Sequence, residues 1–204
     1  MAPTRIARRR RRLVRRRTGI CLVAVGLAML GVVAYQLWGT GLATARAQAG
    51  FRAQIRAHGF PARPIPGGAI GFIRIPRIHL DMAFVEGIGP TALAEGPGHY
   101  RQTPLPGDGG NVAIAGHRTT YLHPFWALNR LEPGDRVTLQ TRAGTFVYRV
   151  VWQRTLPPGS WWVIGPTRAP SLTLTTCNPR FLATQRLVVR AVQIAGPSTA
   201  VTAS

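Results

Sequence analysis

The chain has 204 residues, with 26 basic and six acidic side chains, so that 26 − 6 gives a formal net charge of +20. All the basic residues are arginine, which indicates codon bias in a GC-rich genome. Part of the positive charge is therefore not evidence of function. A 46% share of hydrophobic residues excludes a disordered polyelectrolyte and is typical of one modest globular domain. Two cysteines, Cys21 and Cys177, exclude a disulfide-rich scaffold and a cysteine zinc cluster. Six scattered acids argue against a paired-carboxylate hydrolase.

The N-terminal segment combines a basic run with an apolar run. Residues 1–17 carry nine arginines and no acid, and Gly19 to Trp38 is a run of twenty uncharged residues. At ~1.5 Å per helical residue such a run spans the ~30 Å hydrocarbon core of a bilayer. We therefore predict a cytoplasmic Arg-rich tail at 1–17 and a transmembrane anchor at 18–38. The arginines hold the N-terminus in the cytoplasm, so the rest of this single-pass plasma-membrane protein lies outside.

A cleavable signal peptide is the alternative interpretation of this segment. Ala47-Gln48-Ala49 matches a small-x-small cleavage pattern, and the preceding region is basic. The apolar run is longer than the ~7 to 15 residues of a signal peptide, which favours an uncleaved anchor. Binding of nucleic acid by the arginine run is disfavoured by the adjacent membrane span.

The remainder of the chain divides into a linker, a β-rich domain and a tail. Residues 39–67 contain an Ala/Arg/Gln-rich stretch able to form a short helix and then a Pro/Gly-rich run, so we predict a stalk or linker. In 68–195, short β-type runs such as NVAIAG, TFVYRVVWQ and SLTLTT alternate with turn signals. Seven or eight strands with few helices predict a small β-barrel or sandwich. Residues 196–204 are predicted to be a flexible tail.

Cys177 is the one cysteine of this outer domain, and it directly follows the alternating run SLTLTT. Reactive groups are commonly presented where a strand ends in a loop. A lone thiol outside the membrane has no disulfide partner in the chain, which indicates that its reactivity is used. The alternative is a buried cysteine that acts as a small apolar residue.

His117 and Arg186 are the residues that suit a thiol chemically. His117 follows the apolar run NVAIAG, and an imidazole can both activate a thiol and protonate an amine leaving group. Arg186 opens the last strand, RLVVRAVQI, and an antiparallel pair would bring it to the same end of a barrel as Cys177. A guanidinium there would stabilise an oxyanion. Taken alone, a histidine or an arginine at such a position is more often structural or on the surface than catalytic.

Together these segments resemble a known family. IAGHRTTY, TLTTC and the following RLVV are similar to the His, Thr-Leu-x-Thr-Cys and Arg motifs of sortases, the membrane-anchored cysteine transpeptidases of Gram-positive bacteria. The resemblance covers 68–195, and GHRTTY with HPF and TLTTCNPRF most resemble the class E sortases of high-GC actinobacteria. It implies a mainly β fold, an eight-stranded sortase-type β-barrel with short helices, preceded here by one transmembrane helix.

The resemblance also implies roles for individual residues. Cys177 would be the nucleophile, His117 the general acid and base, and Arg186 the stabiliser of oxyanion and substrate. Thr176 matches a position that orients or stabilises the acyl intermediate. Tyr121 matches a class E position linked to accepting Ala in the second place of the sorting signal, so the implied substrate is LAxTG-like.

The implied reaction sets the expected partners. The enzyme would cleave a secreted protein after the Thr of its sorting signal, form a thioester, and pass the protein to an amine of a peptidoglycan precursor. Two alternatives stay open: a pilin-polymerising sortase, and a non-catalytic, membrane-tethered basic module that binds anionic wall polymers. Neither the chain order of papain-like enzymes nor the motif spacing of L,D-transpeptidases fits.

No cofactor, metal or nucleic acid is expected. The remaining histidines show no metal-type spacing with an acidic partner, so we interpret them as structural; they are His58, His79, His99 and His123. The glycine-rich loop PLPGDGGN lacks the GxxxxGKS pattern of a phosphate-binding loop.

Overall fold

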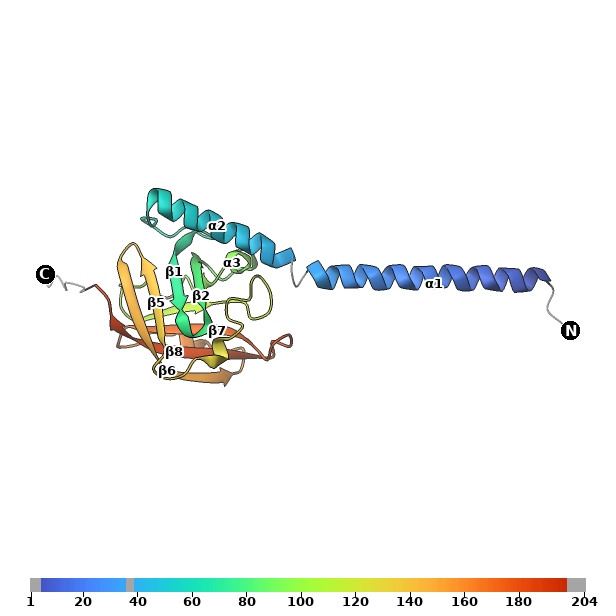
Figure 1. Ribbon diagram of the computed structural model, residues 1–204. Helices are drawn as coiled ribbons and strands as arrows, with labels where there is room; N and C mark the ends of the chain where they lie inside the picture. Colours follow the sequence, from blue (N-terminus) through green and yellow to red (C-terminus); the bar gives the residue numbers. More distant parts are fainter. Residues whose placement is uncertain (1–4, 36–38, 198–204) are drawn as a thin grey trace. The chain divides into compact units, whose positions relative to one another are not determined.

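The computed structural model describes residues 5–35 and 39–197. The chain forms two compact units, Met1–Gly39 and Thr40–Ser204, which are described separately. In the first unit, helix α1 runs from Arg5 to Ala34 (Figure 1). Its part Val14–Ala34 is long and apolar enough to cross a membrane, properties that a signal sequence shares. The end of the predicted anchor at 36–38 and most of the predicted tail, 198–204, lie outside the described residues.

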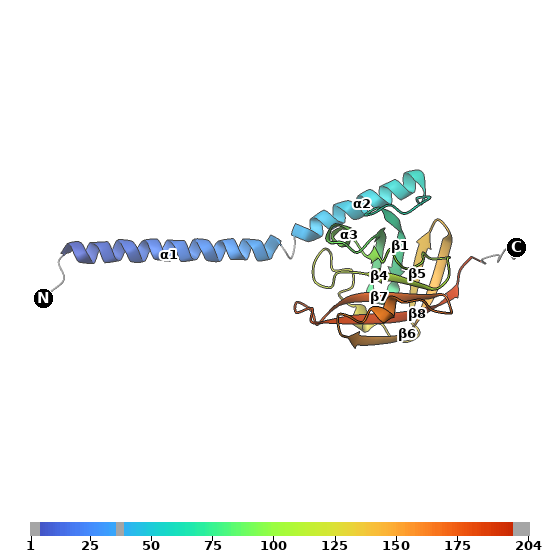
Figure 2. The same cartoon turned by 180° about the vertical axis from the view of Figure 1, so that it is seen from behind.

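Within the described residues, eight strands close into a barrel, which confirms the fold predicted from the sequence (Figures 1 and 2). The strands are β1 (Ala69–Ile75), β2 (Leu80–Glu86), β3 (Gly98–His99), β4 (Asn111–Ala115), β5 (Arg136–Thr141), β6 (Gly144–Leu156), β7 (Ser171–Asn178) and β8 (Gln185–Ala195). Their order around the barrel is β1-β2-β3-β4-β7-β8-β6-β5. The β2/β3 and β4/β7 pairs are parallel and the other pairs are antiparallel.

Alternation of side chains along each strand separates the barrel interior from its outer surface. In β7, Leu172 and Leu174 point inward and are fully buried in the hydrophobic core with residues such as Phe84 and Phe146. Thr173 and Thr175 therefore face outward, yet they too are buried. The β6–β7 connection covers Thr173 and Tyr100 covers Thr175, which is why β7 is buried on both faces.

Helix α2 (Thr40–His58) packs on the barrel beside the short helix α3 (Pro90–Glu95) (Figure 2). It belongs to the segment predicted as a stalk. The buried Gln48 side chain donates to the Ala83 carbonyl at 3.0 Å and accepts from the Ala83 N–H at 2.7 Å. Thr44 donates to the Ala94 carbonyl at 2.7 Å. These side chains recur about every four residues, so one face of the helix is held on the domain.

Within the described part of the barrel domain, three 3₁₀ turns join the strands: η2 (Pro76–Ile78), η3 (Leu128–Arg130) and η4 (Trp161–Ile164). The first lies between β1 and β2, the second precedes β5, and the third lies in the connection from β6 to β7. The latter two contribute to the region described next.

Candidate active site

Strand pairing brings the predicted residues to one edge of the barrel. Parallel strands β4 and β7 are in register at Ala115 and Thr175, so the residues that come after these two positions emerge on the same side. His117 and Cys177 each lie two positions further on. Strand β8 runs antiparallel to β7 and pairs Arg186 directly with Cys177. The topology therefore gathers His117, Cys177 and Arg186 although sixty residues separate the first two in the chain.

Arg186 shares a face of the sheet with Cys177, because directly opposed residues of an antiparallel pair point the same way. Its Nη1 donates to the carbonyl of Ala183, in the turn between β7 and β8, at 3.0 Å and to that of Gln185, the first residue of β8, at 2.9 Å. These two bonds hold the guanidinium and leave its other N–H groups without a protein hydrogen-bond partner among the described residues.

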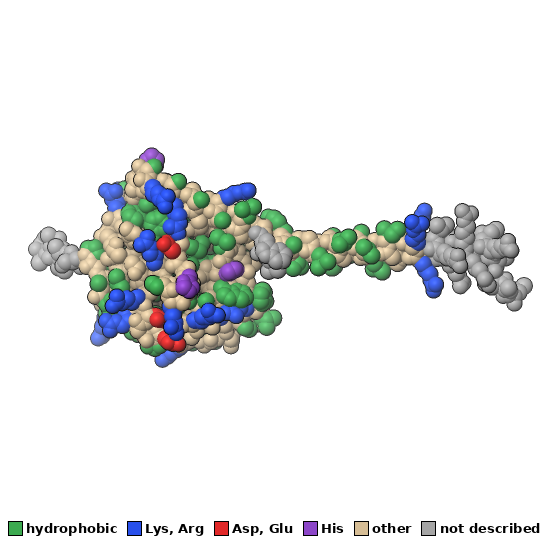
Figure 3. Space-filling model, in the orientation of Figure 1, with side chains coloured by type: hydrophobic (Ala, Val, Ile, Leu, Met, Phe, Trp, Pro, Cys, Tyr) green, Lys and Arg blue, Asp and Glu red, His purple; other side chains and the backbone are tan. Residues whose placement is uncertain are grey.

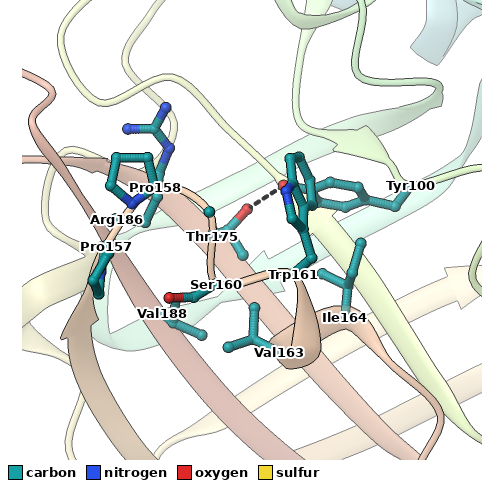
Figure 4. A pocket seen from close by; sticks show the side chains of 11 residues that line it. Tyr100, Pro157, Pro158, Ser160, Trp161, Val163, Ile164, Thr175, Arg186 and Val188 are labelled. Atoms are coloured by element: carbon teal, nitrogen blue, oxygen red, sulfur yellow. Dashed lines mark hydrogen bonds between the residues drawn. The ribbon is translucent and has the colours of Figure 1, made fainter.

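A pocket of about 360 Å³ adjoins Arg186 on the outer surface of β7 and β8 (Figure 4). Thr175 lies between Arg186 and Trp161, which stand at opposite sides of the pocket. The Tyr100 hydroxyl is hydrogen bonded to Thr175 Oγ1 at 3.0 Å. The lining is mainly apolar, and Thr175 is one outward position from Cys177 along β7. The pocket can thus hold an apolar peptide side chain next to the thiol.

A buried polar network fixes the η4 wall of this pocket. Asn111 Nδ2 donates to the Val163 carbonyl at 3.0 Å and to the Gly165 carbonyl at 2.9 Å. Arg190 Nη2 donates to the Val163 carbonyl at 2.6 Å. Thr173 Oγ1 donates to Asn111 Oδ1 at 2.7 Å. Because buried polar groups cost free energy unless they are paired, these bonds hold the wall against the sheet.

The His117 loop is tightly turned. Tyr121, Leu122 and His123 have φ values of 55°, 59° and 38°, in the left-handed region that non-glycine residues rarely adopt. The ring of Tyr121 lies over His117, with centroids 4.9 Å apart. Burial lowers the pKa of His117 from its ordinary value of 6.5. The neutral imidazole, which can accept a proton, is therefore favoured near neutral pH.

Reciprocal hydrogen bonds join the chain around His117 to the chain around Cys177. The Gly116 N–H donates to the Thr175 carbonyl at 3.1 Å, and Thr176 Oγ1 donates to the Gly116 carbonyl at 2.7 Å. A Cβ at Gly116 would lie 2.6 Å from the ring of Phe125, so only glycine fits there. The Thr176 side chain is buried and lies on the opposite face of β7 from Cys177, so it contacts the backbone beside His117.

Arg118 supplies a further contact between the two segments. Its Nη1 donates to the Cys177 carbonyl at 3.1 Å and to Asn178 Oδ1, and its Nη2 donates to Asn129 Oδ1 at 3.0 Å. Burial, followed by repulsion from Arg180, lowers the pKa of Arg118, whereas attraction to Cys177 raises it. Sequence reasoning missed Arg118, Asn129 and Asn178. The only signal was the position of Arg118 directly after His117.

The other histidines lie apart from this edge or serve other contacts. His99 is buried, with Nδ1 at 3.0 Å from Glu86 Oε2 and Nε2 at 3.2 Å from the Pro104 carbonyl. His123 lies against Trp126, with ring centroids 5.5 Å apart. In the part of the chain that the structure describes, no group of three His, Cys, Asp or Glu side chains could hold a metal ion.

A family model described as the sortase domain matches residues 73–194. Sortase SrtE1 of Streptomyces coelicolor is 32% identical over 198 residues, which are 85% of this chain and 55% of that protein. The chain thus spans about half the length of this curated relative.

Solved structures give the same result. The structure of sortase E from Streptomyces avermitilis superposes with a TM-score of 0.59 at 34% identity, covering 64% of this chain and 91% of that one. Sortase E1 from Streptomyces coelicolor, solved with a tripeptide in the active site, has a TM-score of 0.59 at 30% identity, covering 65% of this chain and 92% of that one.

Proposed function

The chain belongs to the sortase family of cysteine transpeptidases, with relatives named sortase E, and from this we propose that it anchors secreted proteins to the cell wall. Its substrate would carry an LAxTG- or LPxTG-like sorting signal, cleaved after Thr. The observation that carries the proposal is the pairing of Cys177 with Arg186 at the barrel edge that His117 also reaches.

We propose that Cys177 Sγ attacks the Thr carbonyl carbon of the sorting signal. His117 takes the thiol proton and gives it to the departing Gly amine as the peptide bond breaks, which leaves a thioester on Cys177. The amine of a peptidoglycan precursor then attacks the thioester carbonyl and loses a proton to His117. The amide forms as the thiolate leaves, and the thiolate recovers the proton from His117.

Arg186 is proposed to stabilise the oxyanion in both steps. Its guanidinium is held by the Ala183 and Gln185 carbonyls, so little reorganisation is needed when negative charge develops on the carbonyl oxygen. Thr176 contributes by holding Gly116, the residue before His117. No cofactor is required for this acyl transfer.

Substrate selection is assigned to two parts of the site. The pocket between Arg186 and Trp161 would hold an apolar side chain of the sorting signal. Tyr121, stacked on His117, would contact the second signal residue and favour Ala over Pro there. The LAxTG preference rests on the class E resemblance of this loop.

We propose a plasma-membrane location for the enzyme. Residues 1–17 would stay in the cytoplasm, 18–38 would cross the membrane and the catalytic domain, 68–195, would face the cell wall. Helix α1 has a suitable apolar stretch, and the basic residues before it support this orientation. In this arrangement the site meets secreted proteins and wall precursors, but no nucleic acid.

The test uses the full chain in detergent with fluorogenic LAxTG and LPxTG peptides, with and without an added amine. We expect amine-dependent ligation, preferentially of LAxTG, that Cys177→Ala abolishes. Cys21→Ala is the matched control, because Cys21 lies in α1, and it should keep full activity. Ligation that survives Cys177→Ala, or a folded protein that turns over neither peptide, would reject the proposal.

The acceptor separates wall anchoring from pilin polymerisation. We expect a peptidoglycan-stem amine to resolve the thioester faster than a lysine side chain within a protein. The non-catalytic basic module predicts that Cys177→Ala leaves function intact. On the face in Figure 3, arginines lie in several separate groups with carboxylates among them, not in one continuous basic surface.

A further inference from the structure

We propose that Arg118 is a positioning residue that holds Cys177 at a fixed place relative to His117. This inference rests on the proposed function, since it assigns a role within the same site. Arg118 adjoins His117 in the chain and donates to the carbonyl of Cys177 itself, at 3.1 Å. One side chain therefore couples the backbone of the proposed base to that of the proposed nucleophile.

The guanidinium is placed for this role by contacts on two sides. Nη1 binds the Cys177 carbonyl and Asn178 Oδ1, while Nη2 binds Asn129 Oδ1 from η3. The planar fork of arginine suits such a bridge, which an ammonium cannot reproduce. Only 6% of Arg118 is exposed, so water does not compete for these bonds.

Asn129 links Arg118 to a second arginine. Its Oδ1 also accepts from Arg180 Nη2 at 3.2 Å, and Arg180 lies 4.0 Å from the ring centroid of Trp126. The η3 turn is therefore connected to the β7–β8 turn on the far side of Cys177. Movement of the Cys177 backbone away from His117 would break several of these contacts together.

Arg118 also brings an uncompensated positive charge to the thiol. None of the ion pairs formed by the described residues includes Arg118. Its Nε is buried without a hydrogen-bond partner in the structure. A buried cation without a carboxylate is costly to stability. Arg190 carries the same cost, but of these two buried arginines only Arg118 binds the Cys177 carbonyl. Negative charge on Cys177 would offset that cost.

The alternative is that Arg118 is only a structural residue. The second buried arginine of the domain, Arg190, makes this distinguishable, because it binds Val163 and stacks near Trp152 but makes no contact with Cys177. Loss of Arg190 removes a comparable buried cation from the pocket wall. Arg118→Gln and Arg190→Gln should therefore have similar effects on stability, but only Arg118→Gln should slow the alkylation of Cys177.

The test compares Arg118→Gln, Arg118→Lys and Asn129→Ala in the full chain carrying Cys21→Ala, so that Cys177 is the one remaining thiol. The measurements are kcat and KM on an LAxTG peptide, the rate of Cys177 alkylation by iodoacetamide at neutral pH, and thermal unfolding. Arg190→Gln is the control for loss of a buried guanidinium.

For Arg118→Gln we expect kcat to fall on the order of 100-fold, with KM nearly unchanged because the pocket is intact. Alkylation should slow about tenfold as the nearby charge is lost. Arg118→Lys should restore much of the alkylation rate but little of kcat, because an ammonium keeps the charge without bridging Cys177 and Asn129. Asn129→Ala should lower kcat while alkylation stays fast.

Arg190→Gln should raise KM and leave alkylation at the parental rate. Parental kcat and alkylation in folded Arg118→Gln would overturn the proposal, as would equal slowing of alkylation in Arg190→Gln. If Arg118→Gln does not fold, Arg118→Lys and Asn129→Ala decide by the same criteria. If the parent turns over no peptide, the proposed function fails, while the order of alkylation rates still tests Arg118.

Discussion

The two faces of β7 are both buried but are covered by different parts of the chain. On the inner face, Leu172 and Leu174 pack in the barrel core. On the outer face, Thr173 and Thr175 are covered by the pocket wall and Tyr100 through hydrogen bonds. The difference shows how one strand serves as a rigid core element and as the floor of a site. Substitution of the inner leucines should therefore change stability, and substitution of Thr173 or Thr175 should change the site.

The largest effect on stability is expected on the inner face. Leu174 is 0% exposed, so Leu174→Ala removes buried methyl groups and leaves a cavity. We expect the free energy of unfolding to fall by about 2–5 kcal/mol, measured by thermal unfolding of the full chain in detergent. At a temperature where the variant is folded, kcat should stay within about twofold of the parental value. A large loss of kcat in the folded variant would mean that the two faces are not independent.

A smaller effect is expected at the hydrogen bond between Tyr100 and Thr175 on the outer face. Thr175→Val keeps the shape of the side chain but leaves the buried Tyr100 hydroxyl without this partner. We expect a loss of about 1 kcal/mol in stability and a higher KM, because the floor of the pocket changes.

A double-mutant cycle with Tyr100→Phe checks this expectation. Removing both partners should cost less than the sum of the single substitutions, since neither polar group is then left unpaired. If KM is unchanged in Thr175→Val, the pocket does not contribute to substrate binding.

Much of this arrangement could be predicted from local sequence pattern. The alternation in SLTLTT predicts a strand with two distinct faces, and Cys177 directly after it is placed at a strand end. Turn signals between short β-type runs predict a small β-barrel or sandwich, and the family resemblance implies the eight-stranded barrel. The closed eight-stranded barrel and the pairing of Cys177 with Arg186 agree with those predictions.

Contacts between distant segments could not be predicted in this way. Arg118 is one of 26 chemically equivalent arginines, and only the fold places it against a carbonyl 59 positions away. Gln48 lies in an Ala-rich stretch typical of a linker, but its amide binds Ala83, 35 positions further on. The roles of such polar groups depend on tertiary neighbours, which composition and periodicity do not specify.

The smallest expected effect concerns pH and arises at the barrel edge, where His117 is partly buried. Burial lowers the pKa of His117 from 6.5, so the unfolded chain binds a proton there at a higher pH than the folded chain does. Stability should therefore fall as pH falls through 6.5 and should level off below the folded-state pKa. The inner face of β7 carries no ionisable side chain from Leu172 to Leu174 and adds nothing to this dependence.

Thermal unfolding of the full chain in detergent at a series of pH values checks the sign. His117→Gln should lose less stability between neutral and mildly acidic pH than the parent does, because the group that resists protonation is gone. His58→Gln, at an exposed position near the end of α2, is the matched control and should follow the parental curve. If His117→Gln also follows the parental curve, other groups control the acid sensitivity and the barrel edge does not differ from the core in this respect.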